Sequence, residues 1–273
     1  MAFLSLWIEA IGIGFRLLLR GQWKNGIKVL IAPIGYWRCR PFATTKQEFK
    51  RFSAPTILDI GSPKMLSLLL ARHTPRQIFA TDLDDPVLFK RWDTSAKAMG
   101  LTNYIAQFQD ACSLQYPDAV FDLVYSISVI EHIPGEGDSD ALREIARVLK
   151  PGGVAVIEVP YRRKYETVYQ RYSSRGAPLA QAEFYERHYD QAELERRLLS
   201  SADGLRVRQV SILGEHLPID PWIATPRLPK MIRYLLLPME PLLAAFNYWQ
   251  RPDDTQGRPL AALIVFDKAF VAK

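Results

Sequence analysis

The fold is decided by residues 56–61, which read TILDIG. A short run rich in β-branched residues predicts a buried strand, and Gly61 lets the chain turn directly after it. Similar apolar runs recur along the chain. The first strand is therefore expected at Thr56–Ile60, and the others at Gln77–Thr81, Tyr104–Phe108, Val120–Ser126, Val154–Val159, Leu205–Leu213 and Leu260–Phe266.

Helical signals separate most of the first five runs. Asp85 followed by Pro86 predicts a helix that extends to about Met99. A second helix is expected from about Asp138 to Leu149, and the Pro-Gly-Gly at 151–153 ends it. Asp190 and Glu193 form a capping-box pattern for a third. This alternation predicts an α/β fold whose mostly parallel, seven-stranded sheet has helices on both faces.

Polar residues stand where the first four strands end. In such a sheet, ligands bind outside the carboxyl ends of the strands. Asp59 and Gly61 end the first strand, and Asp82 ends the second, 23 residues after Asp59. An acid at that distance suits the hydroxyls of a ribose. Asp110 follows the third strand and Ser126 ends the fourth. The sequence thus predicts a nucleotide-like ligand at this edge.

Four segments carry a family resemblance: ILDIG at 57–61, ATDLD at 80–84, QDACSLQYPDAVFDLVYSISVIEHIP at 109–134 and REIARVLKPGGVAVIEVP at 143–160. In order and spacing they resemble the motifs of class I S-adenosylmethionine-dependent methyltransferases of the small-molecule, type 11-like group. The resemblance covers roughly residues 54–160 and continues loosely to the C-terminus. It implies a Rossmann-like fold and S-adenosyl-L-methionine as cofactor, with S-adenosyl-L-homocysteine as product.

The same resemblance implies roles for individual residues. Asp82 would bind the ribose, Leu83 would pack on the adenine, and Asp110 and Ala111 would bind the adenine edge. The methionine end would meet Asp59, Gly61, Ser62 and Ser126. The alternative for the acids is a strand-end cap. The family's first loop is usually glycine-rich, whereas Pro63, Lys64 and Met65 follow here. Lys64 could instead offer its charge to the cofactor carboxylate.

The choice of catalytic residue depends on the acceptor, because methyl transfer needs a general base only when the acceptor carries a proton of high pKa. His132, just past the fourth strand, is the first candidate, followed by His188 and Tyr189. The alternative for His132 is a loop histidine bonded to the backbone. Aromatic and cationic residues at 161–172 and 185–189 lie where the family builds its substrate cover, and a solvated loop is the alternative.

Charge is unevenly distributed along the chain. The net charge is +6, yet residues 1–51 hold nine basic and two acidic side chains, so the remainder is nearly neutral. A neutral body argues against a nucleic-acid partner. The two cysteines, Cys39 and Cys112, are far apart and lack metal-ligand spacing. We therefore expect no metal site, and a reducing cytoplasm as location.

The first twenty residues predict an amphipathic helix, because Ser5, Glu9, Gly12, Arg16 and Arg20 fall on one narrow stripe. This helix either packs on its own domain or lies at an anionic membrane surface. We divide the chain into a basic N-terminal segment, 1–51, and a methyltransferase domain, 52–273. That domain carries an apolar insertion at about 218–250, where prolines predict two short helices.

Together these features predict a methyltransferase that acts on a small-molecule or lipid-linked acceptor, with O-methylation favoured slightly. It would be cytoplasmic and attached peripherally to the inner membrane face, and a homodimer is compatible with the apolar insertion. Two alternatives stay open: an RNA or protein methyltransferase, and a catalytically silent binding scaffold.

Overall fold

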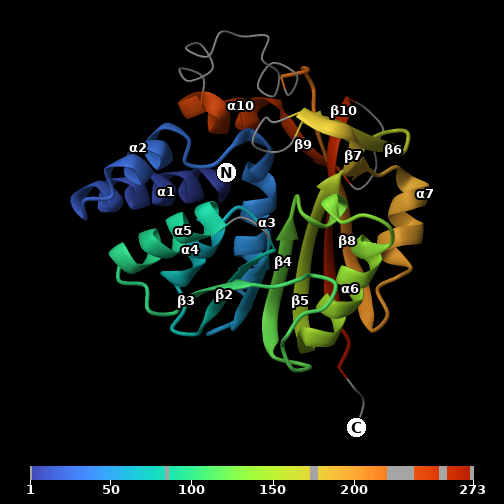
Figure 1. Cartoon of the computed structure of the whole chain (residues 1–273), viewed down its shortest axis with the longest axis horizontal. Helices are drawn as coiled ribbons and strands as arrows, with labels where there is room; N and C mark the ends of the chain where they lie inside the picture. Colours follow the sequence, from blue (N-terminus) through green and yellow to red (C-terminus); the bar gives the residue numbers. More distant parts are fainter. Residues whose placement is uncertain (1, 84–85, 173–177, 220–236, 252–256, 271–273) are drawn as a thin grey trace.

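A computed structural model describes residues 2–83, 86–172, 178–219, 237–251 and 257–270. An eight-stranded sheet runs through its centre, in the order β3-β2-β1-β4-β5-β10-β8-β9 (Figure 1). The first five of these strands are parallel, β10 is antiparallel to both of its neighbours, and β9 is antiparallel to β8. Their bounds are β1 Ile57–Ile60, β2 Ile78–Asp82, β3 Tyr104–Phe108, β4 Phe121–Ile127, β5 Leu149–Pro160, β8 Leu205–Glu215, β9 Tyr248–Arg251 and β10 Arg258–Lys268.

This sheet confirms the predicted α/β class and all seven predicted strands. Two strand features were not predicted. β9 is a short addition beside β8, and β6 (Glu166–Tyr172) pairs with β7 (Pro178–His188) in a separate hairpin. The residues of this hairpin are largely polar, so they lack the apolar runs by which the other strands were recognised.

Helices cover both faces of the sheet, as expected, because neighbouring strand residues point to opposite sides. Ile57 and Leu123 face one core, whereas Leu58 and Val124 face the other. The first face is covered by α4 (Met65–Ala71) and α5 (Pro86–Ala98), and the second by α6 (Gly137–Val148) and α7 (Gln191–Leu194) (Figure 1). Asp190 caps α7 by accepting a hydrogen bond from the Glu193 amide, as its capping-box pattern predicts.

The N-terminal segment packs on the α4 and α5 side of the sheet. It comprises α1 (Ala2–Leu19), α2 (Trp23–Ile31), the 3-10 turn η1 (Tyr36–Arg38) and α3 (Cys39–Phe49). One stripe of α1 is buried in the same core as the strands: Phe3, Leu6, Ala10, Ile13 and Leu17. One face of α1 thus packs on its own domain. Within the described residues, no helix is long and apolar enough to cross a membrane.

The predicted insertion is described only in part, because one of its two expected helices lies outside the described residues. Its second part contains η4 (Leu237–Met239) and α10 (Glu240–Asn247), which contact the N-terminal helices. The buried Glu240 carboxylate accepts a hydrogen bond of 2.8 Å from the Tyr36 amide. The insertion and the N-terminal segment are therefore joined.

Candidate active site

The loop after β1 is organised around Asp59, whose side chain is completely buried. Its carboxylate accepts hydrogen bonds from the Ser62 amide, at 3.0 Å, and from the Ser67 hydroxyl. Lys64 Nζ lies 3.4 Å from Asp59 Oδ1 and donates to the Thr81 carbonyl oxygen at 2.7 Å. Burial raises the Asp59 pKa, and the Lys64 charge opposes that rise. Asp59 thus shapes the loop from inside, and the Lys64 charge faces inward, which corrects the expectation that it offers its charge to the cofactor.

Gly61 and Ser62 fix the path of the same loop. Gly61 has a φ of +63°, and a Cβ there would stand 2.4 Å from Val129 Cγ1, so only glycine fits. The Ser62 hydroxyl accepts a hydrogen bond from the Ile127 amide at 2.8 Å and donates to the Ile60 carbonyl oxygen. These bonds hold the loop against β4, in the position the sequence predicted for the methionine end of the cofactor.

Asp82 and Asp110 lie at the carboxyl ends of the neighbouring strands β2 and β3, joined by a 3.0 Å hydrogen bond from the Gln109 amide to the Asp82 carbonyl oxygen. Asp82 is half-buried and Asp110 is exposed, so both carboxylates are accessible to a ligand. Leu83 is 65% exposed beside them, and Ala111 is half-buried. This edge provides two accessible carboxylates and an apolar side chain, which suit a nucleoside.

Ser126 is the remaining predicted cofactor contact. It is completely buried, and within the described part of the chain its Oγ has no hydrogen-bond partner. Buried hydroxyls are normally paired, so an unpaired one at a ligand-binding edge is the expected state of a residue whose partner is a bound molecule.

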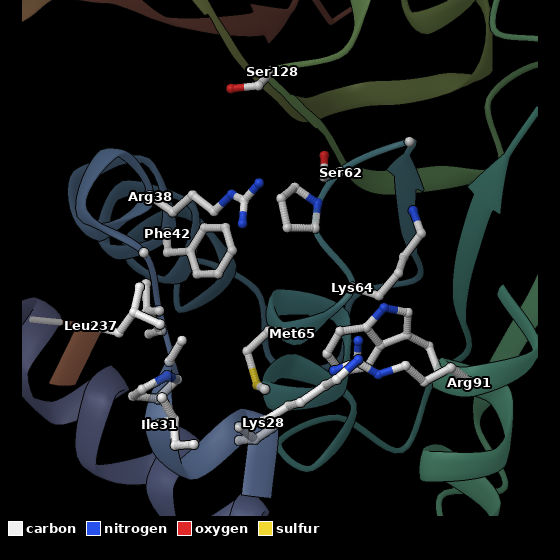
Figure 2. A pocket seen from close by; sticks show the side chains of 18 residues that line it. Lys28, Ile31, Arg38, Phe42, Ser62, Lys64, Met65, Arg91, Ser128 and Leu237 are labelled. Carbon is white, nitrogen blue, oxygen red and sulfur yellow. The ribbon is translucent and has the colours of Figure 1, made fainter. Parts of the chain in front are cut away.

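A cavity of about 620 Å³ lies between the β1 loop and the N-terminal segment (Figure 2). Its walls are mostly apolar, and cationic side chains interrupt them. The lining comes mainly from residues 28–42 and 61–65, joined by Arg91 and Trp92 of α5, Ser128, and Leu237. Two segments distant in the sequence therefore line one cavity, and one of them is the loop that the resemblance assigns to the cofactor.

Ser128 connects this cavity to a buried carboxylate. It lies just past β4 with a φ of +54°, a conformation that non-glycine residues seldom adopt. Its Oγ donates to Glu158 Oε2 at 2.8 Å, and its amide donates to the Glu158 carbonyl oxygen. Burial raises the Glu158 pKa to about 7, although the Ser128 hydrogen bond and the charge of Arg38 oppose that rise. Strained backbone and a shifted pKa are features of functional sites.

Of the three catalytic candidates, His132 and His188 stand together near the β6–β7 hairpin. His132 Nδ1 bonds to the Tyr185 carbonyl oxygen at 2.8 Å, and its Nε2 lies 3.7 Å from both Glu131 and Glu186. His188 Nε2 bonds to Glu186 at 2.8 Å. Neither histidine is among the described residues that line the cavity. The role of His132 as general base stays a prediction.

Tyr189 is placed differently from what was expected. It is completely buried, and its hydroxyl donates to Asp138 Oδ2 at 2.6 Å. Burial and the Asp138 charge raise its pKa well above the ordinary value. The Tyr189 hydroxyl is thus already bonded inside the core, and its catalytic role stays a prediction. Together, Tyr189 and Asp138 belong to a polar network in the core.

Sequence reasoning missed the wall formed by residues 28–42, and it missed Ser128 and Glu158. It also expected the segments at 161–172 and 185–189 to cover the substrate, yet none of their described residues lines the cavity. Arg38 was counted only as part of the basic segment. The one available signal was Glu158 itself, a charged residue inside the apolar run of β5.

Comparisons with known proteins agree with this geometry. Residues 58–157 match the family model described as a methyltransferase domain. A curated relative, 27-O-demethylrifamycin SV methyltransferase from Amycolatopsis mediterranei, is 29% identical over 98 residues, which are 36% of this chain and 35% of the relative. The match thus spans about a third of that relative's length.

Two solved structures show the same fold. The [4+2]-cyclase SpnF is 18% identical with a TM-score of 0.57, covering 87% of each chain. A SAM-dependent methyltransferase from Methanosarcina mazei is 16% identical with a TM-score of 0.52, covering 81% of this chain and 95% of its own. Because one of these two proteins is a cyclase, the fold alone does not define a reaction.

The strand order, the loop around Gly61 and the carboxylates at the ends of β2 and β3, taken with the matched segment, define a class of protein. This chain contains, at residues 58–157, a methyltransferase domain of the class I S-adenosylmethionine-dependent type. Its domain takes S-adenosylmethionine as cofactor, and the accessible Asp82 and Asp110 and the unpaired Ser126 hydroxyl fit that molecule.

Proposed function

We propose that this protein transfers a methyl group from S-adenosylmethionine to a small apolar or lipid-linked acceptor held in the cavity. The observation that carries the proposal is the composition of the cavity wall. The same cavity is lined by residues 61–65, on the cofactor side, and by residues 28–42, from the N-terminal segment. A molecule in it would therefore lie next to the cofactor loop.

Each group of residues has a defined task in this proposal. Asp82 and Asp110 hold the ribose and adenine, and Ser126 lies under the methionine portion. When bound, the cofactor supplies an electrophilic methyl group on a sulfonium. The protein contributes mainly by positioning the acceptor and excluding water, which supply much of the rate of such a displacement.

The cavity wall indicates the chemistry of the acceptor. Val29, Ile34, Phe42 and Met65 provide buried apolar surface, whereas Lys28, Arg38 and Arg91 bring positive charge. Such a wall suits an amphiphile with an apolar body and a polar or anionic group.

O-methylation is supported by the Ser128–Glu158 pair. A hydroxyl acceptor must lose its proton, and the Ser128 hydroxyl, which lines the cavity, donates to the Glu158 carboxylate. The pair offers a route for that proton to a buried carboxylate. The name of the Amycolatopsis relative also describes methylation of an O-demethylated small molecule.

Attachment to an anionic membrane surface is the second part of the proposal. Ile8, Phe15 and Leu19 are exposed on one side of α1, and Trp23, Ile27 and Ile31 recur every four residues along the exposed face of α2. Four exposed cations accompany them: Arg16, Arg20, Lys24 and Lys28. Lys28 and Ile31 also line the cavity, so a lipid acceptor would enter from the docked face.

The function is tested by incubating the purified protein with methyl-labelled cofactor and with separated lipid, polar, RNA and protein fractions. We expect label in the lipid or polar fraction. Asp82→Ala should weaken cofactor binding by roughly 10- to 100-fold in calorimetry, the scale of lost hydrogen bonds to polar groups. Asp203→Ala, which removes an exposed acid from a distant turn, should leave binding unchanged.

Other results would contradict the proposal. Label confined to RNA or protein would favour the alternative acceptors, and cofactor binding without transfer to any fraction would favour a silent scaffold. Failure of the intact protein to bind S-adenosylmethionine would overturn both the cofactor assignment and the function.

A further inference from the structure

A cluster of carboxylates and imidazoles lies beside the Ser128–Glu158 pair and has no role in the function proposed above. Glu131 and His132 come from η2 (Ile130–His132), directly after β4, and Glu186 comes from β7. One ligand atom from each of the three lies within 4.8 Å of the others. His132 Nε2 is 3.7 Å from both Glu131 Oε1 and Glu186 Oε2.

Glu131 is the unusual member of the cluster. Its side chain is 1% exposed, and within the described residues neither carboxylate oxygen has a hydrogen-bond partner. Burying a carboxylate without a partner costs several kcal/mol, so such groups are normally paired or bound to a metal ion.

The surroundings aim the other two groups at the same point. His132 Nδ1 bonds to the Tyr185 carbonyl oxygen and therefore carries the proton, which leaves the Nε2 lone pair facing the two carboxylates. His188 bonds to Glu186 Oε1, so that Glu186 presents Oε2 to His132. Hydrogen bonds of this kind, which fix the far side of each ligand, are typical of metal sites.

The hairpin strand that supplies Glu186 is also fixed to the β4 loop. Arg187, buried at 3% exposure, donates to the Ile133 and Gly135 carbonyl oxygens at 2.8 and 3.0 Å. The His132 side chain is 36% exposed, so the cluster opens to solvent on one side. The three groups are thus held in place and remain accessible to an ion.

We propose that Glu131, His132 and Glu186 form a binding site for a divalent cation. Ligand atoms around an ion at about 2.1 Å stand about 3.0 to 4.2 Å apart. The two 3.7 Å distances from His132 Nε2 fall within that range, and all three ligand atoms lie within 4.8 Å of one another. Two carboxylates and one imidazole favour an ion that accepts oxygen and nitrogen ligands, such as Mn²⁺. Cysteine spacing could not reveal this site, because its ligands are carboxylates and an imidazole.

The test measures Mn²⁺ binding to the full-length protein after treatment with a chelator. The electron paramagnetic resonance signal of free Mn²⁺ reports how much of the ion remains unbound. We expect one saturable site with a dissociation constant below about 100 μM, a range typical of specific ion binding. Glu131→Gln should weaken binding at least tenfold. This variant removes an unpaired buried charge, so it should fold at least as well as the parent protein.

His132→Ala and Glu186→Gln should weaken Mn²⁺ binding in the same way, whereas Glu183→Gln, an exposed acid on the same strand, should not. Unchanged Mn²⁺ affinity in the Glu131 and Glu186 variants would overturn the assignment, as would the absence of saturable binding in the parent protein. Mn²⁺ retained by His132→Ala would remove His132 from the site. These measurements need neither cofactor nor acceptor, so their outcome is independent of the methyltransferase proposal.

Discussion

Asp59 and Lys64 form a buried ion pair in the loop after β1. Both side chains are almost completely buried, at 0% and 2% exposure, and Lys64 also donates to the Thr81 carbonyl oxygen. Lys64→Met should therefore lower the free energy of unfolding by about 3–5 kcal/mol, because it leaves Asp59 as an unpaired buried charge. Lys97→Met, which removes an exposed i,i+4 pair with Asp93, should cost less than about 1 kcal/mol.

The pH dependence of this loss has a definite sign. Burial already raises the Asp59 pKa, and removing Lys64 raises it further. A carboxyl whose pKa is higher in the folded than in the unfolded state binds its proton more tightly when folded, so stability falls as pH rises between the two values. In urea denaturation, the loss of unfolding free energy caused by Lys64→Met should thus be larger at pH 8 than at pH 5. Equal deficits at both pH values would contradict this account.

At the residue scale, the sequence predicted the edge of the sheet where a ligand would bind, but it did not predict the directions of individual side chains. Asp82 and Asp110 could be placed because parallel strands end at one edge, and both are accessible there. The inward direction of Lys64 and the burial of Tyr189 could not be predicted, since they depend on partners at distant positions: Thr81 for Lys64 and Asp138 for Tyr189.

At the scale of elements, a buried charge network joins α6, β7 and the helical turn after α7. The Asp138 carboxylate accepts two hydrogen bonds of 2.7 Å from Arg197, and Arg187 Nη1 lies 3.2 Å from it. Asp138→Ala should lower the free energy of unfolding by about 3–5 kcal/mol, because the buried Arg187 loses its carboxylate partner and the buried Arg197 keeps only Glu136.

Asp140→Ala provides the matched comparison, since Asp140 is two residues away and its pair with Arg143 is largely exposed. Its effect in urea denaturation should stay within about 0.5 kcal/mol. A loss below 1 kcal/mol for Asp138→Ala would show that the network contributes little to stability. The start of α6 was predictable from its sequence pattern, but this network was not, because the sequence does not show which arginines come within reach of Asp138.

At the scale of the whole molecule, the active site depends on contacts between segments far apart in the sequence. The sequence set residues 1–51 apart from the domain at 52–273. In the structure, α1 shares a core with the sheet and residues 28–42 form part of the cavity wall. Local patterns predicted α1, α5, α6 and α7, but they contain no information about which surface a helix will cover. The amphipathic pattern of α1 was compatible with a membrane and with a core, and the burial of Leu6, Ile13 and Leu17 accounts for one face only.

The remaining face of the α1–α2 hairpin carries the membrane prediction. Deleting residues 1–20 would expose the core, so point variants on α2 are the better test. Lys24→Gln with Lys28→Gln should reduce sedimentation with anionic vesicles by on the order of tenfold at low salt, because each cation contributes about 1 kcal/mol near such a surface. The parent protein should also be released at high salt, where the attraction is screened.

Trp23→Ser with Ile27→Ser should weaken binding at both salt concentrations, since it removes exposed apolar side chains, whereas Val207→Ser on β8 should have no effect. The molar mass of the protein in solution, measured without vesicles, distinguishes a membrane-binding face from a homodimer interface. If α2 formed a dimer interface, the α2 variants would change that mass. If the full-length protein stays in the supernatant at both salt concentrations, the apolar face of α2 does not bind membranes, and a lipid acceptor would have to reach the cavity through solution.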